Sequence, residues 1–104
     1  MAEEASVVRI QAVLPPPGRM VTVKVGSVKV AIANVGGRLR AFDDTCTHEG
    51  CSLSRGRLAG PTVLCPCHGS RFDLRTGEVL DPPAEDPLRI RSITQDGEDI
   101  LIEA

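Results

Sequence analysis

The sequence is poor in aromatic residues. It has two phenylalanines and no tryptophan or tyrosine, so aromatics make up 2% of 104 residues, whereas apolar residues make up 41%. The core must therefore be built mainly from valine, isoleucine and leucine, and the β-branched members of this set favour strands. The length is that of one domain, and we expect residues 1–104 to form a single core.

The sequence also lacks an excess of basic residues and a long apolar run. A formal net charge of −2 argues against nucleic-acid binding, which needs a concentrated basic face. No run approaches the roughly 18 consecutive apolar residues of a membrane span. The start, MAEEASVVRI, is acidic and lacks the features of a secretory signal. We expect a soluble, cytoplasmic protein without a membrane anchor, whose partner is a protein or a small ligand.

Alternation of apolar and polar residues predicts strands along most of the chain. Between residues 20 and 25, valines alternate with threonine and lysine, which places the valines on one buried face. Near the C-terminus, Leu88 and Ile90 alternate with Arg89 and Arg91. The expected strands lie within residues 6–14, 20–26, 27–35 and 38–42, within 55–65 with a break at Gly60-Pro61, within 70–80 with a turn near Thr76-Gly77, and within 88–104 with a turn at Asp96-Gly97.

Turn and breaker residues separate these strands. Gly26-Ser27 and Gly36-Gly37 are hairpin signals and predict an antiparallel meander. PPPG at residues 15–18 ends the first strand, because proline cannot donate to a ladder. DPPAEDP at residues 81–87 is a stiff loop. Since no segment reads as a helix of three turns, we expect an all-β chain.

All four cysteines and both histidines lie in two short clusters, CTHEGC beginning at Cys46 and CPCHGS beginning at Cys65. The spacing is Cys46-x-His48, 16 residues, then Cys65-x-x-His68. Thiolates and imidazoles bind borderline and soft metals, so the pattern predicts a metal site. Structural zinc sites usually combine a cysteine pair with a histidine pair. Here each cluster supplies one of each, which fits better a two-iron cluster with two histidines on one iron.

C-x-H followed by C-x-x-H in an all-β chain closely resembles the Rieske iron-sulfur proteins. The resemblance implies a small antiparallel β-sandwich or barrel with an inserted cluster-binding subdomain of two loops, about residues 44–87. It implies one [2Fe-2S] cluster per chain. Cys46 and Cys65 would ligate the inner iron, and His48 and His68 the outer, more exposed iron.

Cys51 and Cys67 are left over from this ligand set. In Rieske proteins of quinol-oxidising complexes the matching cysteines form a disulfide between the two cluster loops, so the resemblance implies a Cys51–Cys67 bridge. The alternative is two thiols that merely pack, as a reducing compartment would favour.

Three residues near the ligands bear on the reduction potential. Ser70 matches a serine that donates to a cluster sulfide in the high-potential branch, although a turn residue after Gly69 is the simpler interpretation. Phe72 stands where that branch has a tyrosine, and Glu49 where it has a leucine. A lost hydrogen bond to sulfur and an added negative charge both lower the potential. We expect an intermediate value; Glu49 could equally be a solvated charge without a role.

The sequence offers no catalytic constellation beside these clusters. It shows no nucleophile–base pair, no paired carboxylates and no phosphate-binding loop, and both histidines are expected to be ligands, so we expect an electron carrier and not an enzyme. Pro82, Pro83 and Pro87 resemble the proline loop that shields the cluster, or they simply end a strand.

Three hypotheses about function remain at this point. The first is a soluble Rieske ferredoxin between a flavoprotein reductase and a terminal oxygenase. The second is a small subunit of a larger redox enzyme, such as a nitrite reductase, an arsenite oxidase or a quinol-oxidising complex. The third is a zinc-stapled interaction module.

Overall fold

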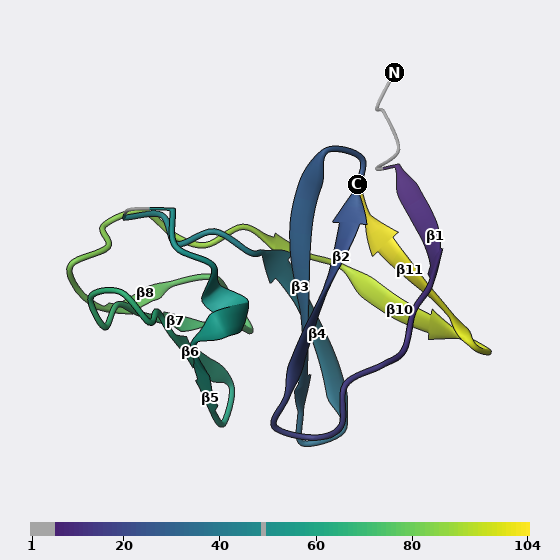
Figure 1. Ribbon diagram of the computed structural model, residues 1–104, viewed down its shortest axis with the longest axis horizontal. Helices are drawn as coiled ribbons and strands as arrows, with labels where there is room; N and C mark the ends of the chain where they lie inside the picture. The colour runs from purple at the N-terminus through teal and green to yellow at the C-terminus, as the bar shows by residue number, and fades with distance from the viewer. Residues whose placement is uncertain (1–5, 49) are drawn as a thin grey trace.

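The computed structural model describes residues 6–48 and 50–104, and regular structure there is almost entirely β-strand (Figure 1). This part of the chain has eleven strands in three antiparallel sheets and one 3₁₀ helix, η1 (Leu53–Arg55), as expected for an all-β chain. The strands are β1 (Val7–Gln11), β2 (Met20–Val25), β3 (Val28–Val35), β4 (Arg38–Asp43), β5 (Arg57–Ala59), β6 (Thr62–Leu64), β7 (Arg71–Asp73), β8 (Val79–Asp81), β9 (Ile90–Arg91), β10 (Ile93–Asp96) and β11 (Asp99–Glu103).

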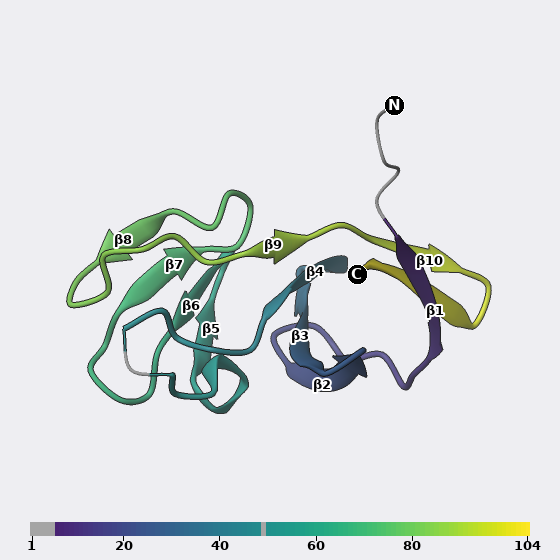
Figure 2. The same ribbon diagram turned by 90° about the horizontal axis from the view of Figure 1, so that it is seen from above.

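Two of the sheets, β1-β11-β10 and β2-β3-β4-β9, share an aliphatic core and lie side by side in Figures 1 and 2. The alternation predicted for β2 is confirmed, because its valines pack against this core while Thr22 and Lys24 are exposed. Each buried valine or isoleucine contributes roughly 1.5–3 kcal/mol. The expected antiparallel sandwich is therefore present. Its buried members are Val25, Val30, Ile32, Ala41, Ile100 and Ile102.

Strand β3 is buried on both faces, which simple alternation did not predict. Val30 and Ile32 face the sandwich core, whereas Ala31 and Ala33 belong to a second core with Phe42 of β4. The four residues from 30 to 33 are all 0% exposed. The sheet of β2, β3, β4 and β9 is thus a middle layer between two cores. The expectation of a single core was wrong, because this sheet buries side chains on both of its faces.

The third sheet, β5-β6-β7-β8, lies beside this middle layer (Figures 1 and 2). Its β5–β6 hairpin turns at Gly60-Pro61, with Ala59 opposite Thr62, as the sequence predicts. The β7–β8 connection turns through residues 74–78, which includes the predicted Thr76-Gly77. Leu53, Val63, Phe72 and Leu74 are fully buried in the second core.

A glycine holds the end of the proline-rich loop against this sheet. Gly77 has φ +85°, and a Cβ there would lie 2.1 Å from the carbonyl oxygen of Leu88. The same approach lets the Leu88 N–H donate to the Gly77 carbonyl at 2.7 Å. Only glycine permits both the left-handed backbone and this contact, so the path from β8 to β9 is fixed at this point.

Arg91 departs from the alternation of its neighbours. Arg89 is exposed, but Arg91 is only 3% exposed. Its Nε donates to the Asp43 carboxylate and its Nη1 donates to the Glu103 carbonyl at 2.9 Å. A buried guanidinium needs such partners, and these join β9 to β4 and to β11.

Candidate metal centre

The two Cys/His clusters form loops with the same backbone hydrogen bonds. In each loop the cysteine N–H donates to the carbonyl five residues later, and a glycine four residues after the cysteine donates back to the cysteine carbonyl. The bonds are Cys46 N to Cys51 O at 2.8 Å, Gly50 N to Cys46 O at 2.9 Å, Cys65 N to Ser70 O at 2.8 Å and Gly69 N to Cys65 O at 3.3 Å. Both glycines have positive φ, +77° and +80°. Both loops have a glycine four residues after the cysteine, and this equal spacing in the sequence could have predicted that the two loops share one backbone conformation.

The two ligand-type cysteines are buried together beneath the loops. Cys46 and Cys65 are free thiols, each 3% exposed. Burial raises the pKa of the Cys65 thiol, and its hydrogen bond with the Cys46 thiol raises it further. The backbone N–H groups of Cys67 and His68 act in the opposite direction on this pKa. These N–H groups would stabilise a thiolate bound to a cation.

The two histidines lie together at the surface. His48 and His68 are both exposed, and their ring centroids are 5.4 Å apart with the ring planes at 82°. One ring comes from each loop. The structure therefore brings the four sequence-predicted residues into two pairs, with sulfur inside and nitrogen outside.

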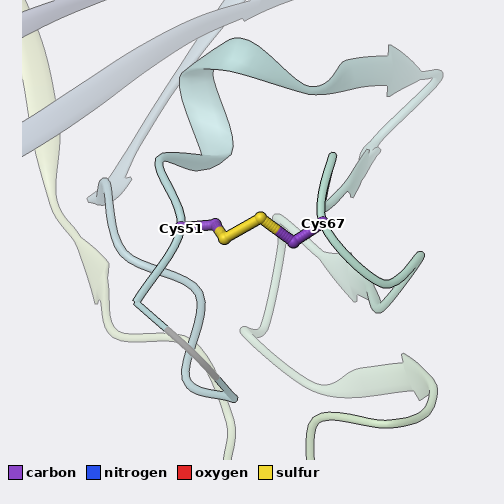
Figure 3. Close-up of a disulfide and its surroundings, with 2 residues drawn as sticks. All are labelled: Cys51 and Cys67. Atoms are coloured by element: carbon purple, nitrogen blue, oxygen red, sulfur yellow. A yellow bond between two sulfur atoms is a disulfide. The ribbon is translucent and has the colours of Figure 1, made fainter.

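A disulfide joins the loops beside these pairs. Cys51 and Cys67 are bonded, with their Cα atoms 6.5 Å apart, and Figure 3 shows the bridge spanning the gap between the two loops. The pairing is the one that the resemblance implies, and the alternative of two separate thiols does not describe this structure. The bond closes a loop with a sequence separation of 16 residues.

The proline-rich loop covers the same end of the molecule. Thr47 Oγ1 donates to the Asp86 carbonyl at 2.7 Å. Pro83 is half-buried and, with His48, Thr47, Glu85 and Asp86, lines a hollow of about 330 Å³. This places the loop directly against the first Cys/His loop.

The remaining predicted residues have different positions. Ser70 is 0% exposed, and its Oγ accepts a hydrogen bond from the Ala84 N–H at 2.9 Å, which leaves the hydroxyl hydrogen to point elsewhere. Phe72 is fully buried in the same core as Cys46 and Cys65. Glu49 lies outside the described residues. The hydrogen bond of Ser70 connects the second loop to the proline-rich loop.

Sequence reasoning missed Asp44, which anchors the first loop. Its side chain is 0% exposed and lies 3.2 Å from Lys29 Nζ. The carboxylate accepts hydrogen bonds from Ser52 Oγ at 3.1 Å, Ser54 N at 2.6 Å and Ser54 Oγ at 2.8 Å. The signal available in the sequence was an acid two residues before Cys46, followed by a Ser-x-Ser pair.

The donor set fits a two-iron cluster with mixed ligands. Two buried thiols and two exposed imidazoles come from loops held together by a covalent bond, and each loop gives one donor of each kind. Such a cluster needs two sulfur and two nitrogen donors on different irons.

No helix in the described ranges is long and apolar enough to cross a membrane.

Comparison with known proteins gives the same answer. The family model of the Rieske [2Fe-2S] domain matches residues 5–93. The biphenyl dioxygenase ferredoxin subunit of Pseudomonas sp. (strain KKS102) is 43% identical over 89 residues, which are 85% of this chain and 82% of that protein.

Two solved structures are also similar. The ferredoxin of carbazole 1,9a-dioxygenase from Nocardioides aromaticivorans IC177 has a TM-score of 0.86 and 29% identity, over 95% of this chain and 98% of that chain. A chain in the complex of reduced oxygenase and oxidized ferredoxin in carbazole 1,9a-dioxygenase has a TM-score of 0.78 and 34% identity, over 84% of this chain and 82% of its own. These relatives are named as a ferredoxin subunit and a ferredoxin, which are electron-transfer components of dioxygenase systems. The chain therefore belongs to the Rieske [2Fe-2S] domain family, whose centre is an iron-sulfur cluster of the [2Fe-2S] kind.

Proposed function

We propose that the chain is the ferredoxin component of an oxygenase system, carrying one electron at a time from a flavoprotein reductase to a terminal oxygenase. One [2Fe-2S] cluster per chain would supply the one-electron chemistry when bound. Cys46 and Cys65 are proposed to hold its inner iron, and His48 and His68 its outer iron. The chain itself then has no catalytic residue.

The observation that carries this proposal is the placement of the four donors. The sulfur pair is 3% exposed at each residue, whereas both imidazoles are at the surface with their rings 5.4 Å apart. A docked redox protein would therefore meet the histidine edges first. The relatives support the choice of partner, because one of them is a subunit of a biphenyl dioxygenase system and another was solved with its oxygenase.

The surrounding residues are proposed to hold and tune the centre. Residues 44–87 act as the cluster-binding subdomain of a single domain spanning 1–104, and Pro83 shields one side of the site from water. Ser70, whose Oγ accepts a hydrogen bond from the Ala84 N–H, is proposed to direct its hydroxyl hydrogen toward cluster sulfur. Phe72 cannot donate a hydrogen bond, and Glu49 adds negative charge. Together these residues favour an intermediate potential.

A permanent subunit of a larger redox enzyme is the second candidate. The Cys51–Cys67 disulfide favours it, because the matching bridge belongs to Rieske proteins of quinol-oxidising complexes. We nevertheless favour the ferredoxin, because the chain matches 82% of a ferredoxin subunit's length at 43% identity. A cytoplasmic location is part of the same proposal, since the reductase and oxygenase of such systems would have to share the compartment.

Anaerobic electron-transfer kinetics test the proposal. The purified native chain should be coloured, should show an EPR signal at low temperature after reduction, and should pass its electron to an oxidised Rieske oxygenase. His68→Ala should abolish both signal and transfer, whereas Lys24→Ala, an exposed change on β2, should leave both intact. A colourless, iron-free native protein would refute the cluster. Co-purification in a fixed large complex would favour the subunit instead.

A further inference from the structure

Three of the four cysteine sulfurs converge where the two loops meet. The Sγ atoms of Cys51, Cys65 and Cys67 all lie within 4.8 Å of one another. In a tetrahedral zinc site with Zn–S bonds of about 2.3 Å, the sulfurs are about 3.8 Å apart. After reduction the Cys51 and Cys67 sulfurs would have to separate by about 2 Å, and the Cys65 sulfur would have to approach each of them by at most about 1 Å, to surround such an ion.

Two of these sulfurs are held in the disulfide, so the site depends on its oxidation state. We propose that reduction of the Cys51–Cys67 disulfide creates a thiolate site for Zn²⁺ or a similar thiophilic cation, formed by Cys51, Cys65 and Cys67. A dithiol reductant supplies two electrons and two protons and becomes a disulfide itself, leaving two cysteine thiols. The incoming cation then displaces one proton from each of the three thiols.

The backbone is already organised for this second use of the loops. The Cys46 N–H donates to the Cys51 carbonyl at 2.8 Å, and this backbone hydrogen bond involves neither sulfur of the disulfide. Cys67 is exposed and Cys51 is half-buried, so a cation can reach the sulfurs from solvent. The Cys46 thiol, which shares a hydrogen bond with the Cys65 thiol, is available for a fourth position.

The proposed site goes beyond the electron-transfer proposal and competes with it. Cys65 belongs to both ligand sets, so one chain cannot hold the cluster and the thiolate-bound cation together. His48 and His68 belong only to the cluster set, and Cys51 and Cys67 only to the cation set. The disulfide therefore acts as a protecting group that withdraws two competing thiols from metal binding.

Cobalt and zinc titrations of the full-length, iron-free chain test this inference. One sample keeps the disulfide, and the other is reduced with a phosphine that is then removed. The reduced sample should bind one equivalent of Co²⁺ with sulfur-to-cobalt charge-transfer absorption, and Zn²⁺ should displace it. The oxidised sample, in which Cys51 and Cys67 cannot act as ligands, should bind Co²⁺ at least about 10-fold more weakly, since even an outer-shell change costs roughly 10–100-fold in metal affinity.

Two matched double variants separate the ligand sets. The double variant Cys51→Ser/Cys67→Ser should lose the sulfur-to-cobalt absorption. The double variant His48→Ala/His68→Ala, which alters only exposed side chains, should keep this absorption once its disulfide is reduced. Circular dichroism checks that each variant is folded. If the serine variant does not fold, the oxidised wild-type chain provides the same comparison.

The results that would refute the thiolate site are all measurements of metal binding. Equal cobalt affinity of the oxidised and reduced samples, an absorption showing fewer than three sulfur ligands, or loss of binding in the histidine variant would each overturn the inference. None of these outcomes affects the electron-transfer proposal, which depends on the spectrum of the iron-loaded protein. A colourless native protein would refute that proposal without touching this one.

Discussion

We expect Asp44→Ala to destabilise the protein strongly, because this carboxylate fixes the loop that carries Cys46 and His48. Its side chain is fully buried and accepts three hydrogen bonds from Ser52 and Ser54. Hydrogen bonds to a charged group contribute about 1.5–3 kcal/mol each. Their sum overestimates the loss, because the serine hydroxyls can turn toward water while the Ser54 N–H is left without its partner.

The expected loss of unfolding free energy is therefore about 3–5 kcal/mol, the range for breaking a buried charged pair. A domain of this size has a total stability of about 5–15 kcal/mol, so the change should be obvious. Urea unfolding followed by circular dichroism measures it, and the melting temperature should fall by about 4–8 °C for each kcal/mol. Iron release from the loaded protein should accelerate in parallel.

Two control variants separate the loop hydrogen bonds from simple charge pairing. Lys29→Met removes the ammonium beside Asp44, but that lysine is 49% exposed, so we expect a loss of about 1 kcal/mol or less. Asp96→Ala breaks an exposed ion pair with Arg9 and should leave the free energy of unfolding nearly unchanged. A loss below about 1 kcal/mol for Asp44→Ala, or an equal loss for Lys29→Met, would refute the reasoning.

Three further predictions follow from the same loops and sheet. Phe72→Tyr adds a hydroxyl in the core shared with both buried thiols and should raise the reduction potential in a redox titration; an unchanged potential would show that the phenol does not reach sulfur. Cys51→Ser/Cys67→Ser removes a cross-link over 16 residues, and urea unfolding should show a loss of about 3 kcal/mol. The double variant should also release iron faster than the wild-type protein. An equal rate of iron release would contradict a stabilising role of the disulfide. Hydrogen bonds from Arg75 lower the pKa of Asp73 in the folded protein. Their contribution to the free energy of unfolding is therefore complete above pH about 4 and is lost as the pH falls through the pKa of Asp73 in the folded state. Asp73→Asn should flatten that part of the acid unfolding profile.

The alternation of apolar and polar residues and the positions of turn glycines predicted most of the strands. The valines of β2 alternate with polar residues, and β-strand geometry alone then places them on one face. Glycine at the hairpin positions likewise indicates where strands reverse. The alternation did not reveal that β3 is buried on both faces or that Arg91 is buried, because each depends on what packs from another part of the chain. Ala31 faces the second core, and Arg91 meets Asp43 and the Glu103 carbonyl.

The sequence by itself determined the donor types, their spacing and the family, since a C-x-H and C-x-x-H pair restricts the chemistry before any fold is known. The burial of the sulfur pair, the exposure of the imidazole pair and the Cys51–Cys67 bond were only implied by the family resemblance, and the tertiary structure decided them. Tertiary structure alone revealed that Asp44 reaches Ser52 and Ser54. These are contacts between segments many bonds apart, so they depend on how sheets and loops pack. Short-range spacing specifies which atoms are available, and packing specifies which of them meet.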